Sequence, residues 1–342
     1  MTDFQTVRGF EEVWRPPVAI RVRLTRAVLK PAAGPNGAEV RARLVRVTNR
    51  APEVMVKVTG RTRDPGHLRA HLDYISRNGE LDLENQDGML VGSRAAIKDL
   101  AVDWAAEQLA DRRTRADAPF SHSVILSMPA GTNALALRDA ARAFAANTFA
   151  GRHEYVFTLH TDTPRPHVHL SICSRGHAGE RLNPNKADLE RWRQDFAQAL
   201  RDRSVEAEAT ARRARGVTRK PERTPLRKMR DRHEAGKGEM SQVRRAAYQE
   251  AAKAAFQGDT RPRPWERRSL ERQAGVRRTY LAQAALLKGS PDPKDRALGE
   301  KVETFVRSMP APDSQRLALA RELRAANRQM AQDRPAGRDR ER

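Results

Sequence analysis

Three of the chain's nine histidines lie within the eleven residues His160–Leu170, which read HTDTPRPHVHL. Side chains alternate along a strand, so in the run HVHLSIC the residues His167 and His169 share one face and the aliphatic residues share the other. Pairing of this run with the preceding EYVFTLH as a hairpin brings His160 alongside both. Three neutral imidazoles can bind one metal ion and leave coordination positions open for water or substrate. The segment therefore predicts a catalytic metal site.

Tyr74 is the second residue whose placement could do chemistry. In the helical run PGHLRAHLDYISRNG, the apolar stripe of Leu68, Leu72 and Ile75 leaves Tyr74 roughly a third of a turn from its centre. A tyrosine in that position either rests half-exposed on its neighbours or, beside a metal, attacks a phosphorus centre as a phenolate. An ordinary phenol has a pKa near ~10, so the second role needs a base or a strong positive field.

The runs around these residues predict an α+β fold with a central antiparallel sheet flanked by helices. Strand patterns occupy residues 54–58, 122–128, 154–160 and 167–173. Helical periodicity follows at residues 65–79, after Ser93, at 133–149 and at 183–204. The order β-α-α-β-α-β-β-α favours a largely antiparallel sheet.

Composition indicates a polyanionic partner. The chain of 342 residues has a formal net charge of +22, and basic side chains that neutralise phosphates release condensed counterions. DNA or RNA is the expected partner. We find no apolar run long enough to span a bilayer and no secretory signal, and therefore expect no membrane insertion and a cytoplasmic location. The single cysteine, Cys173, excludes an internal disulfide and is expected to be a small buried filler.

Three segments taken in order, HLDYISRNGEL, HSVILSMPAGT and HTDTPRPHVHL, resemble the three motifs of relaxases, the mobilisation nucleases of conjugative plasmids. The resemblance is to the branch of this His-hydrophobe-His superfamily that includes the nuclease cutting T-DNA borders, and it covers about residues 53–216. It implies that Tyr74 cuts one strand at an origin of transfer and stays attached to the 5′ phosphate. It also implies that His160, His167 and His169 hold the divalent metal, Mg²⁺ or Mn²⁺.

The resemblance also extends to neighbouring residues. Ser127 lies in the middle motif and is expected to contact DNA, as are Arg77 and Arg165; the last stands where relaxases often have another histidine. Asp162 belongs to the third motif and is expected to be catalytic. Its residue type allows three roles: capping the proline-rich turn, holding a histidine tautomer, or accepting a proton.

Two further histidines have open roles. His71 precedes Tyr74 by three residues and is interpreted as a solvated side chain, although it is close enough to influence the phenol. His122 precedes the middle-motif strand, and its role stays open, with a plain surface residue as one alternative. The turn in SMPAGTN is able to present backbone N–H groups to a phosphate, although the same residues serve any strand-to-helix turn.

The expected organisation is an N-terminal extension at residues 1–50, a relaxase domain at 51–216, and a basic helical, partly disordered tail at 217–342. The tail has little to bury, and we expect loosely held helices that either bind DNA nonspecifically or carry a signal for a type IV secretion machine. The resemblance implies relaxosome accessory proteins and a secretion coupling protein as partners, and export of the protein on its DNA into a recipient cell.

Other functions compete with this interpretation. An accessory DNA-binding protein would explain the charge but neither the histidines nor Tyr74. A different metal enzyme, such as a phosphodiesterase or an oxygenase, would act without a covalent protein–DNA adduct. A rolling-circle replication initiator shares the chemistry and differs in the origin that is cut.

Overall fold

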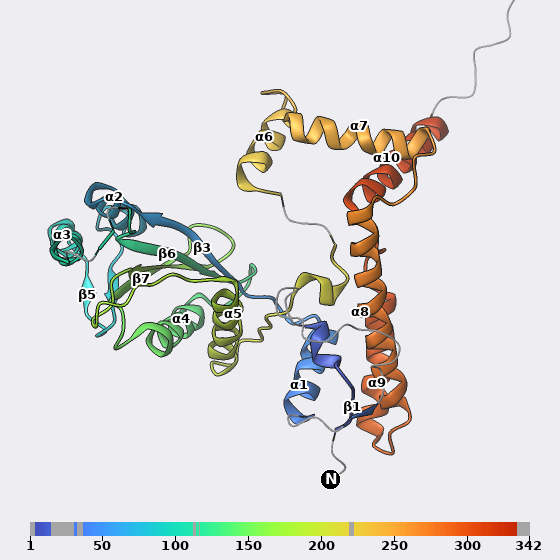
Figure 1. The fold of residues 1–342 in the computed structure, drawn as a ribbon, viewed down its shortest axis with the longest axis horizontal. Helices are drawn as coiled ribbons and strands as arrows, with labels where there is room; N and C mark the ends of the chain where they lie inside the picture. Colours follow the sequence, from blue (N-terminus) through green and yellow to red (C-terminus); the bar gives the residue numbers. More distant parts are fainter. Residues whose placement is uncertain are drawn as a thin grey trace, which may run out of the picture. The chain divides into compact units, whose positions relative to one another are not determined.

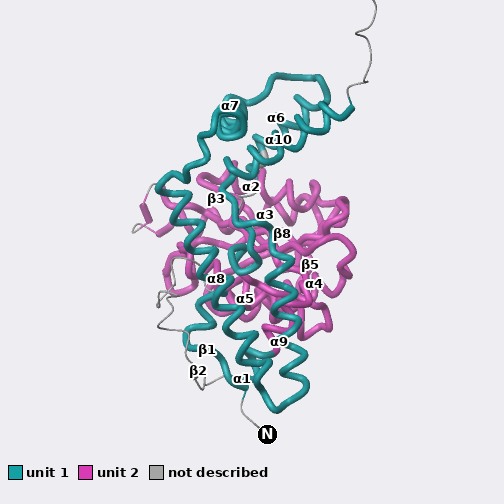
Figure 2. The backbone as a smooth tube through the Cα atoms, turned by 90° about the vertical axis from the view of Figure 1, so that its right-hand side faces the viewer, with its two compact units in different colours: residues 1–41, 211–342 teal, residues 42–210 magenta. Residues whose placement is uncertain are grey.

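The computed structural model describes residues 4–14, 31–32, 37–111, 114–115, 117–218 and 222–333. The chain divides into two compact units: a sheet unit, residues 42–210, and a helical unit, residues 1–41 together with 211–342 (Figure 2). Helix α1 (Gly37–Thr48) begins in the helical unit and ends in the sheet unit. The domain boundaries expected from the sequence stay predictions.

The sheet unit is built on six antiparallel strands in the order β3-β6-β8-β7-β4-β5 (Figure 1). The strands are β3 (Met55–Thr62), β4 (Leu83–Asn85), β5 (Leu90–Val91), β6 (Ser121–Ser127), β7 (Tyr155–His160) and β8 (His167–Cys173). The expected α+β fold with a central antiparallel sheet is confirmed. The small hairpin β4–β5 was not expected, because strands of two or three residues are too short to show a period.

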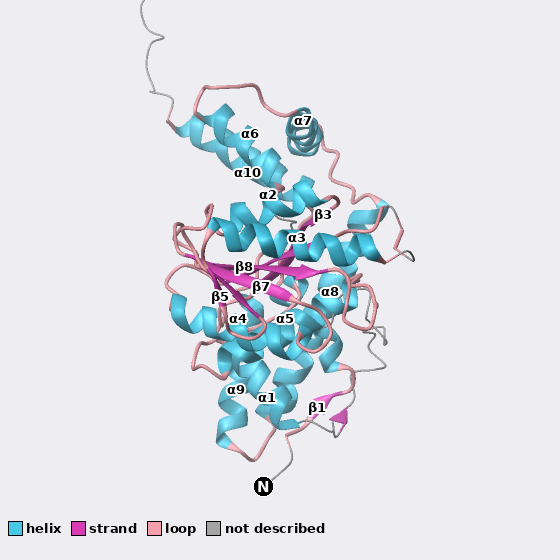
Figure 3. Ribbon diagram, turned by 90° about the vertical axis from the view of Figure 1, so that its left-hand side faces the viewer, coloured by secondary structure: helices cyan, strands magenta, loops and turns pink. Residues whose placement is uncertain are grey.

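Helices cover both faces of this sheet (Figure 3). On one side lie α2 (Pro65–Ile75) and α3 (Arg94–Ala110), and on the other α4 (Ala134–Phe149) and α5 (Lys186–Arg201). The alternating residues Val168, Leu170 and Ile172 of β8 enter the core under α4 and α5. Cys173 instead joins the core under α2 and α3, and its burial raises the pKa of its thiol to about 12, as fits a packing residue. Helices therefore pack against β7 and β8 on both faces of the sheet.

The helical unit has a packed core of its own. Its elements are β1 (Thr6–Val7), η1 (Phe10–Val13), β2 (Pro31–Ala32), η4 (Arg212–Arg215), α6 (Thr224–Glu234), α7 (Gln242–Phe256), α8 (Pro264–Lys288), α9 (Pro293–Arg307) and α10 (Gln315–Gln332). Tyr280 of α8 is fully buried, and its hydroxyl accepts a hydrogen bond from the indole N–H of Trp14 at 2.9 Å. The helices of the tail are confirmed, but loose packing was wrong for α8 and α9, which bury Val276 and Val302 as well.

Within the described ranges, no helix combines the length and the apolar character that crossing a membrane requires.

Candidate metal centre and nucleophile

The hairpin of β7 and β8 brings three histidines together. His160 pairs with His167 in the strand register, and His169 follows two residues later on the same face. The ring centroid of His160 lies 4.5 Å from that of His169 and 5.3 Å from that of His167, and the third pair is 5.1 Å apart. One ring nitrogen from each lies within 4.8 Å of the others, a separation that suits three ligands of one metal ion.

Hydrogen bonds orient two of these rings. The Nε2–H of His160 donates to the carbonyl of Ile75 at 2.7 Å, and the Nδ1–H of His167 donates to the carbonyl of Arg165 at 3.2 Å. With those protons placed, Nδ1 of His160 and Nε2 of His167 keep free lone pairs. Burial and the two neighbouring imidazoles lower the pKa of His169 to about 3, and burial lowers that of His160. Both rings are neutral at pH 7, the state that binds a metal.

Helix α2 places Tyr74 beside the histidines. Leu72 and Ile75 are completely buried, whereas the Tyr74 side chain is 69% exposed, as its position off the apolar stripe predicts. Its ring meets that of His169 edge-on, with 5.9 Å between the centroids. Since the carbonyl of Ile75 also accepts the hydrogen bond from His160, the same helical turn carries the phenol and orients one member of the cluster.

Asp162 forms an ion pair with Arg77 across the site, at 2.6 Å. Arg77 follows the end of α2 in the left-handed conformation, with φ of 55°. Desolvation opposes ionisation of Asp162, but the hydrogen bond and charge of Arg77 outweigh it and lower the pKa of the carboxyl. The pair ties the loop between β7 and β8 to the helix that carries Tyr74. No hydrogen bond joins Asp162 to the three histidines in the part of the chain that the structure describes.

Ser127 and Arg165 occupy different environments. Ser127 is buried at the end of β6, and its hydroxyl donates to the carbonyl of Pro166 at 3.3 Å, which holds the turn before His167. Arg165 is exposed on that turn and has no ion-pair partner among the described residues. Their roles as DNA contacts stay predictions.

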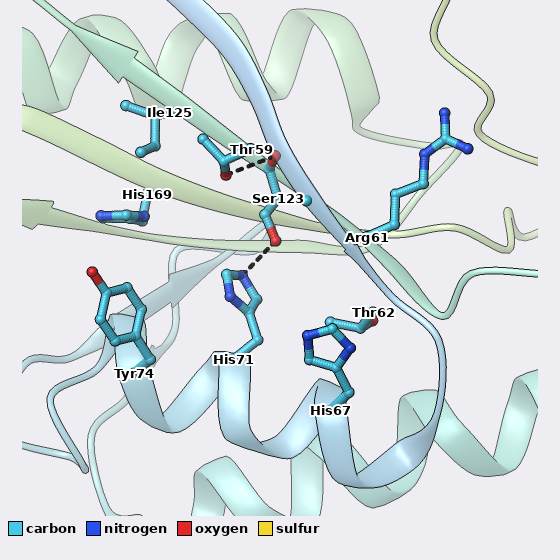
Figure 4. A pocket seen from close by; sticks show the side chains of 10 residues that line it. Thr59, Arg61, Thr62, His67, His71, Tyr74, Ser123, Ile125 and His169 are labelled. Carbon is cyan, nitrogen blue, oxygen red and sulfur yellow. Dashed lines mark hydrogen bonds between the residues drawn. The ribbon is translucent and has the colours of Figure 1, made fainter. Parts of the chain in front are cut away.

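A groove of about 440 Å³ runs between α2 and the edge strand β3 and reaches Tyr74 and His169 (Figure 4). His67, His71 and Tyr74 line it from one face of α2, and Thr59 and Arg61 line it from β3. The Nε2 of His71 and the Oγ of Ser123 are hydrogen-bonded at 2.9 Å, and burial lowers the pKa of His71 to about 4. The interpretation of His71 as a solvated side chain was therefore wrong. Its spacing from His67 and Tyr74, four and three residues, was the available signal.

His122 lies inside β6 and is fully buried, which excludes the alternative of a surface residue. It alternates with Ser121 and Ser123 and shares the face of Val124 toward α4 and α5. Its Nδ1 is hydrogen-bonded to the Ser174 hydroxyl at 2.8 Å, and burial lowers its pKa to about 4. His122 is thus a residue of the core and not of the groove.

Comparison with known proteins identifies relatives of this site. Residues 74–204 match the family model of the MobA/VirD2-like relaxase nuclease domain. The T-DNA border endonuclease VirD2 of Rhizobium radiobacter is 26% identical over 187 residues, which cover 49% of this chain and 44% of that protein. VirD2 of Agrobacterium fabrum is 26% identical over 189 residues, covering 49% and 42%. The chain thus matches less than half the length of these relatives.

Among solved structures, the MobM relaxase domain bound to 26-nucleotide pMV158 oriT DNA is 13% identical. The match covers 51% of this chain and 98% of that one, with a TM-score of 0.37. The family model and the VirD2 sequences confirm, over residues 74–204, the resemblance to relaxases of the branch that includes the T-DNA border nuclease.

Proposed function

We propose that this chain nicks one DNA strand at an origin of transfer by tyrosine transesterification and remains covalently attached to the cut strand. The observation that carries the proposal is the exposed phenol of Tyr74 next to three convergent imidazoles, with its ring 5.9 Å from that of His169. The family match supports nicking at an origin of transfer in general. The tyrosyl adduct is our inference from the geometry and the motif.

The proposed reaction exchanges one phosphoester for another. The Tyr74 oxygen attacks the scissile phosphorus as its proton leaves to solvent or a base, and the bond from phosphorus to the 3′ oxygen breaks. That oxygen takes up a proton and becomes a free 3′ hydroxyl, while the 5′ phosphate stays on Tyr74. Because one ester replaces another, the reverse attack by a 3′ hydroxyl rejoins the strand.

His160, His167 and His169 would hold a divalent cation, since their nitrogens converge and at least two of the rings are neutral at pH 7. A bound cation supplies Lewis-acid polarisation of the phosphate oxygens. Of Mg²⁺ and Mn²⁺, three imidazole donors favour Mn²⁺, because Mg²⁺ prefers oxygen ligands and retains its waters.

The remaining site residues would position the strand. We assign the groove between α2 and β3 to the nucleotides next to the scissile phosphate, because it reaches Tyr74 and is lined by Arg61 and by hydroxyl and imidazole side chains. Arg77 and Arg165 lie on the exposed loops beside the histidines, where a guanidinium can pair with a phosphate. Asp162 would keep Arg77 and the histidine loop in register with α2. Ser127 would act on the site indirectly, by holding the turn before His167 through its hydrogen bond to Pro166.

This proposal also includes the expected partners, which are relaxosome accessory proteins and a type IV coupling protein. It further includes a cytoplasmic location and export of the protein on the transferred strand.

A cleavage assay tests the proposal. Single-stranded oligonucleotides tiled across the DNA that flanks the gene are incubated with the protein and Mn²⁺ or Mg²⁺, together with a second oligonucleotide that carries the same nick region. We expect cleavage at one position and recombinant products that join the two oligonucleotides, since the adduct accepts either 3′ hydroxyl. Cleavage without recombinants would indicate hydrolysis by a metal nuclease. Binding to every sequence without cleavage would favour an accessory DNA-binding protein.

A further inference from the structure

The positive charge of this chain is concentrated outside the unit that carries the histidines. Residues 42–210 contain 24 Lys and Arg against 22 Asp and Glu, a formal net charge of +2. Residues 211–342 contain 34 against 17, a net charge of +17. Attraction to a polyanion therefore depends mainly on the helical unit.

A pocket of about 520 Å³ lies within this unit, between α7, the start of α8 and the start of α10. Its floor is a buried ion pair in which Arg316 donates to Glu266 at 3.0 Å, with side chains 8% and 5% exposed. The hydroxyl of Ser314 also donates to Glu266 at 2.6 Å. Val243 and Leu319 add apolar surface to the wall. Since its polar floor is paired, the pocket is a preformed feature of the packed helices.

Trp265 stands at this pocket with its side chain 64% exposed. The other three tryptophans, Trp14, Trp104 and Trp192, are at most 2% exposed. The guanidinium of Arg263 lies 5.7 Å from the Trp265 ring centroid and also pairs with Glu250, the second acidic residue of the pocket. A large aromatic face is thus left open to solvent where both carboxylates are already neutralised.

Two exposed arginines, Arg267 and Arg268, follow Trp265 by two and three residues on α8, and neither has an ion-pair partner in the described ranges. At a spacing of three residues Arg268 is a neighbour of Trp265 on the helix surface, whereas Arg267 faces another side of α8. An open aromatic face with an exposed, unpaired arginine one helical turn away matches the way proteins bind single-stranded nucleic acid, in which bases stack on aromatic side chains and cations hold the phosphates.

We propose that Trp265 is a stacking platform for an unpaired base of single-stranded DNA, with Arg268 binding the adjacent phosphate. The choice of DNA rests on the proposed function, whereas charge complementarity and the open indole argue for a single-stranded polyanion independently of it. This second contact lies outside the histidine site and holds the strand by its bases without reading their sequence.

The test uses the full chain with metal omitted, so that no cleavage is required. A fluorescently labelled twenty-nucleotide oligo(dT) and an abasic strand of the same length are titrated with the wild type and with Trp265→Ala. We expect the substitution to weaken oligo(dT) binding at least about fivefold and to leave binding of the abasic strand unchanged. Trp265→Phe should retain most of the affinity. Phe256→Ala, which removes another exposed aromatic residue from α7, should have no effect.

Intrinsic fluorescence gives a second readout. Because Trp265 is the one exposed tryptophan, oligo(dT) should quench the wild type and leave the Trp265→Ala emission unchanged. The proposal would be overturned if Trp265→Ala lost as much affinity for the abasic strand, or for duplex DNA, as for oligo(dT). It would also be overturned if the substitution left the affinity for oligo(dT) unchanged. Trp265-dependent binding to anionic vesicles in place of DNA would also overturn it. If the cleavage assay failed while oligo(dT) binding still depended on Trp265, the proposed function would be refuted and this inference would stand.

Discussion

Protonation of His122 should destabilise the fold below pH 6.5. The ring is completely buried, its Nδ1 is bonded to Ser174, and its Nε2 has no hydrogen-bond partner in the described part of the chain. The cationic or titratable groups near it are Arg61, its register partner on β3, and His153. Both disfavour an imidazolium.

The size of the effect follows from the pKa. Burial, with smaller contributions from Arg61 and His153, lowers the pKa of His122 from 6.5 to about 4 in the folded chain. The folded state therefore binds this proton less readily than the unfolded state does. The stability contributed by neutral His122 is fully present above pH 6.5 and is lost as the pH falls toward 4. The complete loss is about 3 kcal/mol, most of it reached by pH 4.5.

The assay compares urea unfolding of the wild type and His122→Gln at pH 7.5 and pH 4.5. The glutamine variant lacks the titrating group and should lose about 2 to 3 kcal/mol less on acidification. Other histidines titrate in both proteins, so their contributions cancel in the difference. The same loss of unfolding free energy in both proteins would refute the reasoning, whatever the absolute stability of the variant at pH 7.5.

Two further substitutions test the site, and a third tests the core that supports α2. His167→Ala should abolish Mn²⁺-dependent cleavage and the rise of melting temperature with Mn²⁺; an unchanged Mn²⁺ affinity by calorimetry would remove His167 from the ligands. Asp162→Asn should slow cleavage about tenfold to a hundredfold with the melting temperature unchanged, because it frees Arg77 and loosens the histidine loop; wild-type cleavage kinetics would contradict that role. Leu72→Ala should cost about 2 to 5 kcal/mol of unfolding free energy, since the side chain is completely buried in the core under α2, and a loss below ~1 kcal/mol in urea would contradict that packing.

Local patterns were sufficient for the centre of the site. The alternation in HVHLSIC and the prolines of the linker predict the β7–β8 hairpin, and the register that places His160 opposite His167 follows from it. The apolar stripe of α2 predicts that Tyr74 is exposed while Leu72 and Ile75 are buried. These features depend on residues close in sequence, where periodicity determines which face a side chain occupies.

Contacts between distant segments could not be predicted in this way. The burial of His122 depends on Ser174, 52 residues away, and that of Trp14 on Tyr280, 266 residues away. The basic, Arg-rich composition did not indicate the core between α8 and α9. A few buried residues such as Tyr280 are enough to form a core once two long helices pack together. The position of His71 in the groove required knowledge that β6 places Ser123 beneath α2.

The covalent bond at Tyr74 is the most direct test of the proposed mechanism. After cleavage of the identified oligonucleotide, the protein is digested with nuclease and trypsin, and the peptide Ala70–Arg77, whose one tyrosine is Tyr74, is examined by mass spectrometry. We predict a nucleotide mass on this peptide through a phosphotyrosine linkage, absent from Tyr74→Phe and from reactions without a divalent metal. Cleaved DNA with an unmodified peptide, or an adduct that persists in Tyr74→Phe, would contradict the assignment of Tyr74 as the nucleophile.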